Sequence, residues 1–155
     1  MIKILFICHG NICRSPMAEF IFKDMTARQG LADQFIVDSA ATSSEEIWNG
    51  IGNPVYPPAR EELAKHGISC KGKRAVQLQK SDYDKYDYLI GMDTMNIRNI
   101  ERMTGHKGEK IHLLLEFAGR YDSVADPWYT GNFVRTYSDV KEGCGALLEH
   151  LMKTL

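Results

Sequence analysis

The sequence predicts a single doubly wound α/β domain that spans residues 1–155. Segments with the apolar pattern of strands alternate with segments of helical periodicity, an order typical of a parallel sheet covered by helices on both faces. A length of 155 residues suits one domain, and a hydrophobic fraction of 44% is sufficient for a buried core.

The net charge of −1 gives no indication of a nucleic-acid or membrane-surface partner. No apolar run approaches the ~20 residues needed to span a bilayer. Residues 1–7 are too short for the core of a signal peptide. We therefore expect a soluble, cytoplasmic protein that binds neither nucleic acid nor membranes.

Four segments are expected to form strands. Residues 3–7 are a continuous apolar run, which fits a strand buried on both faces of a parallel sheet. The other expected strands are residues 35–40, 88–92 and a short one at 110–114.

Helices are expected to follow these strands. Ser15 and Pro16 have the pattern of an N-cap and a first helical residue, and Gly30 is expected to stop that helix. Further helices are expected at residues 58–66, from 93 or 94 to 103, and at 132–155. The last helix has an apolar stripe formed by Val140, Cys144, Leu147, Leu148, Leu151 and Leu155. Residues 42–56 and 119–131 are expected to be loops.

The four cysteines do not suggest a disulfide framework or a zinc site. Cys70 and Cys144 are expected to be small buried apolar residues. Cys8 and Cys13 are spaced more widely than the usual zinc-finger pair, and no second pair exists. We expect no metal ion and no cofactor.

The loop after the first strand carries the chemistry of the sequence. It reads Cys8, His9, Gly10, Asn11, Ile12, Cys13, Arg14 and Ser15. A loop that joins a buried strand to a helix N-terminus can direct successive backbone N–H groups at one centre and bind an anion. Gly10 and Asn11 are the residues expected to tolerate the positive φ that such a cradle requires.

Three side chains of this loop are suited to phosphate chemistry. Arg14 supplies a planar fork that matches two phosphate oxygens. The helix dipole, the N–H groups and Arg14 all favour the thiolate of Cys8, and Ser15 can donate a hydrogen bond to it. The alternative is a buried Cys8 that ends an apolar strand and a surface Arg14.

The loop from Cys8 to Pro16 resembles the active-site loop of the low-molecular-weight protein tyrosine phosphatases. Further similarities, in family order, lie at residues 38–43, 66–68, 87–93 and 126–129, so the resemblance covers essentially the whole chain. It implies a four-stranded parallel sheet with about five flanking helices. It also implies hydrolysis of phosphotyrosine proteins, with inorganic phosphate as product.

The resemblance also implies the roles of individual residues. Cys8 would be the nucleophile, Arg14 the phosphate-binding arginine and Asp126 the general acid, while Ser39 would support Asn11. From the residues alone, Asp126 followed by proline indicates only a turn. His9, Gly10, Asn11, Ile12, Cys13 and Ser15 would form the substrate-binding loop, and Trp48, Trp128 and Tyr129 would flank the pocket.

The sequence departs from the family pattern at several positions. His9 stands where the family commonly has an aliphatic residue, and the loop at residues 42–53 is longer than usual, which leaves the register of Trp48 open. Loop aromatics can also simply pack on the core. Residues 71–73, Lys-Gly-Lys, replace a stretch in which the family often has a histidine that supports the loop asparagine.

Two other functions are compatible with the same fold. Arsenate reduction needs two further, closely spaced cysteines on a mobile segment, whereas Cys70 and Cys144 are isolated and residues 78–88 contain no cysteine. An inert phosphotyrosine-binding module would usually lack the nucleophile or the acid, and this chain retains Cys8, Arg14 and Asp126.

Overall fold

The computed structural model describes all 155 residues and is built on a four-stranded parallel sheet. The strand order is β2 (Phe35–Ala41), β1 (Ile2–Cys8), β5 (Tyr88–Gly91) and β6 (Ile111–Leu113). All three pairings are parallel, and β1 lies in the centre between β2 and β5. The predicted four-stranded parallel sheet is therefore confirmed.

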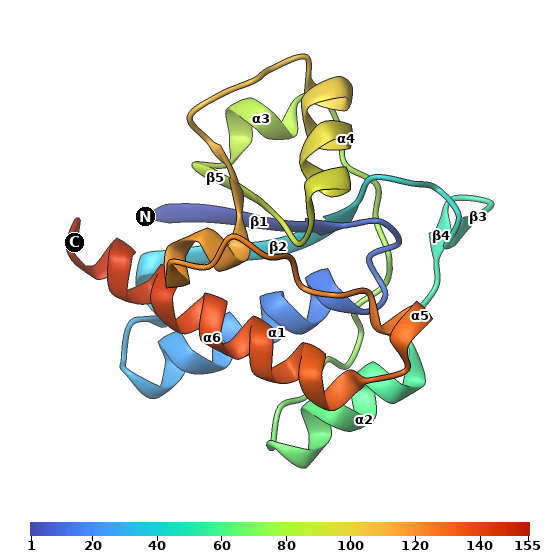
Figure 1. Cartoon of the computed structure of the whole chain (residues 1–155), viewed down its shortest axis with the longest axis horizontal. Helices are drawn as coiled ribbons and strands as arrows, with labels where there is room; N and C mark the ends of the chain where they lie inside the picture. Colours follow the sequence, from blue (N-terminus) through green and yellow to red (C-terminus); the bar gives the residue numbers. More distant parts are fainter.

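Helices cover both faces of the sheet (Figure 1). On one face lie α1 (Arg14–Arg28), α2 (Pro57–Lys65) and α6 (Phe133–Met152), with α1 packed against both β1 and α6. On the other face lie α3 (Asp82–Lys85) and α4 (Thr94–Thr104). The remaining helix, α5 (Pro127–Thr130), is a single turn beside the carboxyl end of the sheet. None of the helices is long and apolar enough to cross a membrane.

The alternation of side chains along β1 divides the core in two. Ile4, Phe6 and Cys8 belong to the larger apolar cluster under α1 and α6, whereas Leu5 and Ile7 belong to the smaller cluster under α4. Both faces are buried, which explains why β1 is continuously apolar. Cys8 therefore ends β1 on the same face as the N-terminus of α1.

Several local expectations from the sequence are corrected by the structure. Helix α1 begins at Arg14 with Cys13 as its N-cap residue, so Ser15 lies inside the first turn and does not cap it. Helix α6 ends at Met152, and the side chain of Leu155 is 54% exposed instead of extending the apolar stripe.

Both predicted loops contain short regular elements. Residues 42–56 include a hairpin of β3 (Ile47–Trp48) and β4 (Ile51–Gly52), and residues 119–131 include α5. Two 3₁₀ segments, Ala32–Gln34 and Leu114–Ala118, and the four-residue helix α3 also had no predicted counterpart.

Candidate active site

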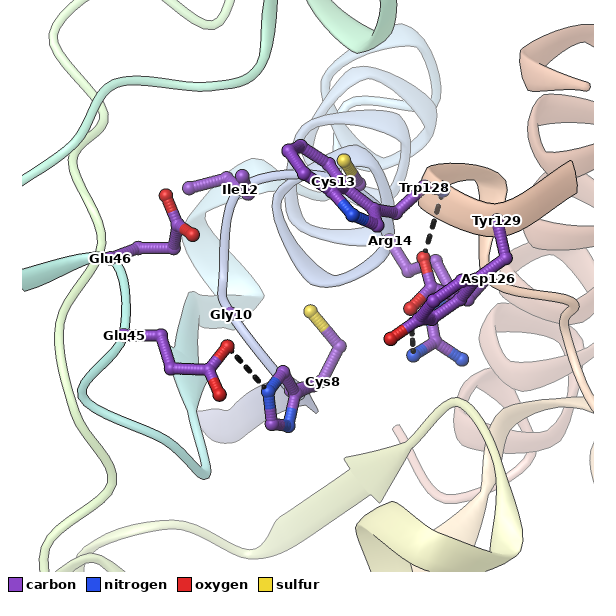
Figure 2. Close-up of a pocket in the computed structure, with 11 residues that line it drawn as sticks. Cys8, Gly10, Ile12, Cys13, Arg14, Glu45, Glu46, Asp126, Trp128 and Tyr129 are labelled. Carbon is purple, nitrogen blue, oxygen red and sulfur yellow. Dashed lines mark hydrogen bonds and ion pairs between the residues drawn. The ribbon is translucent and has the colours of Figure 1, made fainter. Parts of the chain in front are cut away.

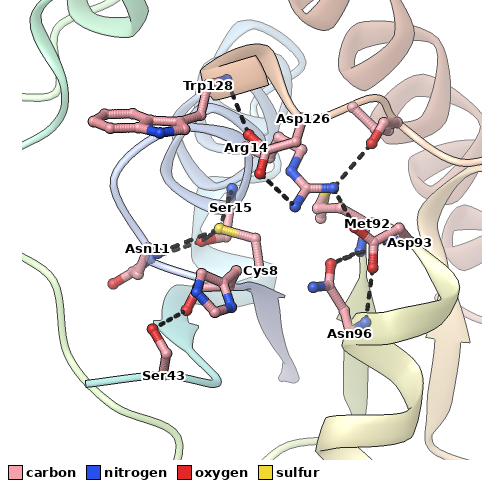
Figure 3. A network of polar contacts seen from close by, with 12 residues as sticks. Cys8, Asn11, Arg14, Ser15, Ser43, Met92, Asp93, Asn96, Asp126 and Trp128 are labelled. Atoms are coloured by element: carbon pink, nitrogen blue, oxygen red, sulfur yellow. Dashed lines mark hydrogen bonds and ion pairs between the residues drawn. The ribbon is translucent and has the colours of Figure 1, made fainter. Parts of the chain in front are cut away.

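The loop between β1 and α1 gathers polar groups around the sulfur of Cys8. Oγ of Ser15 lies 3.0 Å from Sγ, and the backbone N–H groups of Asn11 and Ser15 point at it with N–S distances of 3.3 and 3.4 Å. Figure 3 shows these contacts at the end of β1. Donors at these positions stabilise negative charge on the sulfur.

Asn11 fixes the shape of the loop from inside. Its backbone has φ of 60°, the left-handed conformation expected for it. Its side-chain Nδ2 donates to Oγ of Ser15 (2.8 Å) and to Oγ of Ser39 (2.9 Å), and its Oδ1 accepts from the backbone N–H of Val76 (3.1 Å). The predicted contact between Asn11 and Ser39 is therefore present.

Gly10 is not in the left-handed region, which corrects the expectation of a positive φ at this residue. A Cβ atom added to Gly10 would instead lie 3.2 Å from Cγ of Glu46. A side chain at this position would therefore be crowded by Glu46, which would have to shift by a few tenths of an ångström.

A buried carboxylate supports Ser39 in turn. Oγ of Ser39 donates to Oε1 of Glu19 (2.6 Å), and Nζ of Lys73 donates to the backbone carbonyl of Ser39 (2.9 Å) while lying 3.6 Å from Glu19. Burial lowers the pKa of Lys73. The stretch at residues 71–73, which lacks the expected histidine, thus contributes Lys73 as a partner of Ser39. The side-chain oxygen of Asn11 is bonded by the backbone N–H of Val76.

Arg14 is buried, with 3% of its surface exposed, and its guanidinium makes its hydrogen bonds through Nη1. Nη1 donates to Oδ2 of Asp93 (2.7 Å) and to the carbonyl of Val124 (2.9 Å), and Nη2 lies 3.5 Å from Oδ2 of Asp126. Burial works to lower the pKa of Arg14, but the negative charges of Cys8, Asp93 and Asp126 outweigh it and raise that pKa. Arg14 therefore remains a cation at the floor of the site.

Asp126 lies at the first residue of a helical turn. It is the N-cap of α5, where its Oδ1 accepts from the backbone N–H of Trp128 (3.0 Å) and Pro127 occupies the first helical position. The second oxygen, Oδ2, is the one near Arg14. The cap therefore orients the carboxyl group toward the loop that contains Cys8.

These residues surround an open cavity of about 130 Å³ at the carboxyl end of β1 (Figure 2). Nine of the residues expected at the site line it: Cys8, His9, Gly10, Ile12, Cys13, Arg14, Asp126, Trp128 and Tyr129. The remaining expected residues do not line the cavity. The side chains of Asn11 and Ser15, which belong to the loop, and of Ser39 on β2 are hydrogen-bonded to one another and support the loop from inside. No group of three or more His, Cys, Asp or Glu side chains is arranged to hold a metal ion.

The segment between β2 and β3 contributes different residues from those expected. Trp48 does not line the cavity: it lies on the β3–β4 hairpin, and 79% of its surface is exposed. Glu45 and Glu46 line the cavity instead, and sequence reasoning missed both. Their only sequence signal is an acidic pair within a long loop, which is usually a solvated surface.

Comparisons with known proteins agree with this geometry. The family model described as "Low molecular weight phosphotyrosine protein phosphatase" matches residues 3–155. The low molecular weight protein-tyrosine-phosphatase YfkJ of Bacillus subtilis is 43% identical over 156 residues, which cover 99% of this chain and 97% of YfkJ. A low molecular weight phosphotyrosine protein phosphatase of Sus scrofa is 35% identical, with 95% of this chain and 94% of the relative covered. The crystal structure of YfkJ superposes with a TM-score of 0.93 at 41% identity, covering 99% of this chain and 96% of YfkJ.

Proposed function

Because this chain belongs to the low molecular weight protein-tyrosine-phosphatase family, we propose that it hydrolyses phosphotyrosine in proteins through a phosphocysteine intermediate on Cys8. The whole chain, residues 1–155, would act as a single phosphatase domain. The observation that carries the proposal is the position of the Cys8 sulfur within one cavity that also contains Arg14 and Asp126.

The free donors of the loop support phosphate binding. The backbone N–H groups of Gly10, Ile12, Cys13 and Arg14 donate to no acceptor within the protein. Nε and Nη2 of Arg14 also make no hydrogen bond within the protein, although Nη2 lies 3.5 Å from Oδ2 of Asp126 in an ion pair. A phosphoryl group in the cavity could therefore accept a bidentate pair from Arg14 together with bonds from the loop.

In the first half-reaction the Cys8 thiolate attacks phosphorus in line with the ester oxygen. The S–P bond forms as the bond from phosphorus to the tyrosine oxygen breaks, and Asp126 donates its proton to the departing phenoxide. The transferring group is loose and metaphosphate-like, so catalysis depends on positioning and on the charge of Arg14 and the N–H groups.

In the second half-reaction water attacks the phosphocysteine. The Asp126 carboxylate accepts a proton from the water as the new P–O bond forms and the S–P bond breaks. Inorganic phosphate leaves and the Cys8 thiolate is restored, so both half-reactions use the same two side chains.

Acid-quenched single-turnover reactions test this proposal directly. After mixing with a phosphotyrosine peptide, mass spectrometry of the digested protein should find one phosphoryl group on the peptide that contains Cys8. Cys8→Ser should abolish turnover, because an unassisted serine hydroxyl is a poor nucleophile. Cys70→Ser serves as the matched control and should retain turnover. Phosphate on a residue other than Cys8, or an active Cys8→Ser variant, would show that the mechanism is wrong.

A further inference from the structure

Two carboxylates stand on the wall of the cavity opposite Asp126. Glu45 and Glu46 come from the segment between β2 and β3, whereas Asp126, Trp128 and Tyr129 come from the start of α5 on the other side (Figure 2). The catalytic steps proposed above use neither glutamate, so their presence beside a phosphate-binding loop needs another explanation.

Each of these carboxylates is held in place by one hydrogen bond. Oε2 of Glu45 lies 2.9 Å from Nε2 of His9, and Oε1 of Glu46 accepts from Nδ2 of Asn53 across 3.0 Å. The second oxygen of each side chain has no partner within the protein. The two glutamates therefore present one free acceptor oxygen each near the mouth of the cavity.

The charges of the cavity are separated by depth. Arg14 is the only lysine or arginine among the lining residues, and it is buried at the floor beside Asp93 and Asp126. At the rim, the carboxylates of Glu45 and Glu46 face only His9 as a basic group. The positive charge at the floor is complementary to a phosphoryl group, and the negative charge at the rim is complementary to a cationic group next to that phosphoryl group.

We infer that Glu45 and Glu46 are specificity-determining residues that select phosphotyrosine flanked by lysine or arginine. The inference rests on the proposed hydrolysis of phosphotyrosine and specifies its substrate. A flanking ammonium or guanidinium group would bond the free oxygens of the two glutamates, whereas a flanking carboxylate would be repelled by them. Exposed ion pairs of this kind typically change binding by about 1.5- to 5-fold each.

Three phosphotyrosine peptides that differ only in the two flanking residues provide the test. The flanks are lysine, alanine or glutamate, and kcat/KM is measured for each, with p-nitrophenyl phosphate as a substrate that lacks flanks. The wild type should prefer lysine over alanine over glutamate, with about tenfold between the extremes, and the preference should shrink as salt is added. Equal rates on the three peptides would overturn the inference.

Variants assign the preference to the two glutamates. Glu45→Gln/Glu46→Gln should abolish it, whereas the control Glu149→Gln, which removes an exposed carboxylate from α6, should retain it. Glu46→Lys should reverse the order and favour the glutamate peptide. A lysine preference that survives in both rim variants would assign specificity elsewhere. If the wild type turned over none of these substrates, including p-nitrophenyl phosphate, the proposed phosphatase function itself would be refuted.

Discussion

Nη1 of Arg14 donates to Oδ2 of Asp93 across 2.7 Å, so the residue that caps α4 also holds the arginine at the end of the loop proposed to bind phosphate. The other oxygen of Asp93 accepts from the backbone N–H of Asn96 to complete the cap (2.7 Å), as Figure 3 shows. One carboxylate thus joins the loop after β1 to the helix after β5. With Nη1 fixed in this way, Nε and Nη2 of Arg14 make no hydrogen bond within the protein, and in the proposed mechanism they would donate to phosphate.

Asp93→Asn should separate these two functions of the carboxylate. Asparagine retains a capping oxygen, so thermal stability should change little. The charge-assisted bond to Arg14 is lost, and such bonds are worth ~1.5–3 kcal/mol, so kcat/KM for phosphotyrosine peptides should fall about 10- to 100-fold. Asp93→Ser, which also caps a helix, should lose activity similarly. Full activity in both variants would show that Arg14 needs no support from Asp93.

Removal of the Asp126 carboxyl group should slow hydrolysis most for substrates that have poor leaving groups. Phenyl phosphate leaves as a phenoxide whose conjugate acid has a pKa of about 10 and therefore needs a proton, whereas p-nitrophenyl phosphate needs less assistance. Asp126→Ala should slow phenyl phosphate by ~10²–10⁴-fold and p-nitrophenyl phosphate much less. An equal effect on both substrates would require another residue as the acid.

Asp122 provides the control for this experiment. The hydrogen bond from Arg120 holds the pKa of Asp122 below its usual value, so its carboxyl group has no proton to donate at neutral pH. Asp122→Ala should leave the ratio of the two rates unchanged. Asp139, another nearby carboxylate, is unsuitable as a control because it is buried and accepts hydrogen bonds from Arg120 and Arg135, so its removal would destabilise the fold.

Cys13 is expected to rescue Cys8 from peroxide. Burial, together with the neighbouring charges of Cys8 and Asp126, raises the pKa of the Cys13 thiol, so peroxide should oxidise Cys8 first. The Cys8 sulfenic acid would then condense with the Cys13 thiol to form a disulfide and release water. After peroxide and subsequent thiol treatment, the wild type and Cys70→Ser should recover activity, and Cys13→Ser should not. Equal recovery without Cys13 would mean that it only packs beneath the loop.

Substitution by alanine at two glycines of α6 should change the stability of the protein in opposite directions. A Cβ atom on Gly143 would lie 2.5 Å from Cγ of Leu114, so Gly143→Ala should destabilise the protein by about 1–3 kcal/mol. A Cβ atom on Gly145 would meet nothing closer than Cε of Met25 at 4.0 Å, so Gly145→Ala should stabilise it by up to ~1 kcal/mol through helix propensity. Thermal denaturation measures both effects, and a stabilising Gly143→Ala would contradict the packing described here.

The sequence was most informative where one local pattern determines one conformation. The continuous apolar run at residues 3–7 predicts a strand buried on both faces, and the segment at 93–103 predicts a helix that begins at Asp93 or Thr94, of which Asp93 is the cap. The position of Cys8 at the start of the loop between β1 and α1 follows directly, because that loop is a single short segment. Arg14, in contrast, is held by Asp93 and Val124, and no local pattern predicts such distant contacts.

The segment at residues 42–56 shows why the short hairpin and the opposite wall of the cavity were harder to predict. Asn49 and Gly50 both have positive φ, at 49° and 76°, and Asn-Gly is the usual centre of a tight hairpin turn. The strands on either side have only two residues each, too few for alternation to be recognised. The direction of this hairpin decides that Trp48 faces solvent and that Glu45 and Glu46 line the cavity.

The three hydrogen bonds of the Asn11 side chain have a consequence for successive turnovers. The partners of these bonds, Ser15, Ser39 and Val76, all belong to the protein, so we expect the conformational entropy of shaping the loop to be lost during folding and not at each binding event. The proposed phosphatase would then keep the shape of its loop as inorganic phosphate leaves. Each catalytic cycle would begin with donors that are already directed at the phosphoryl group.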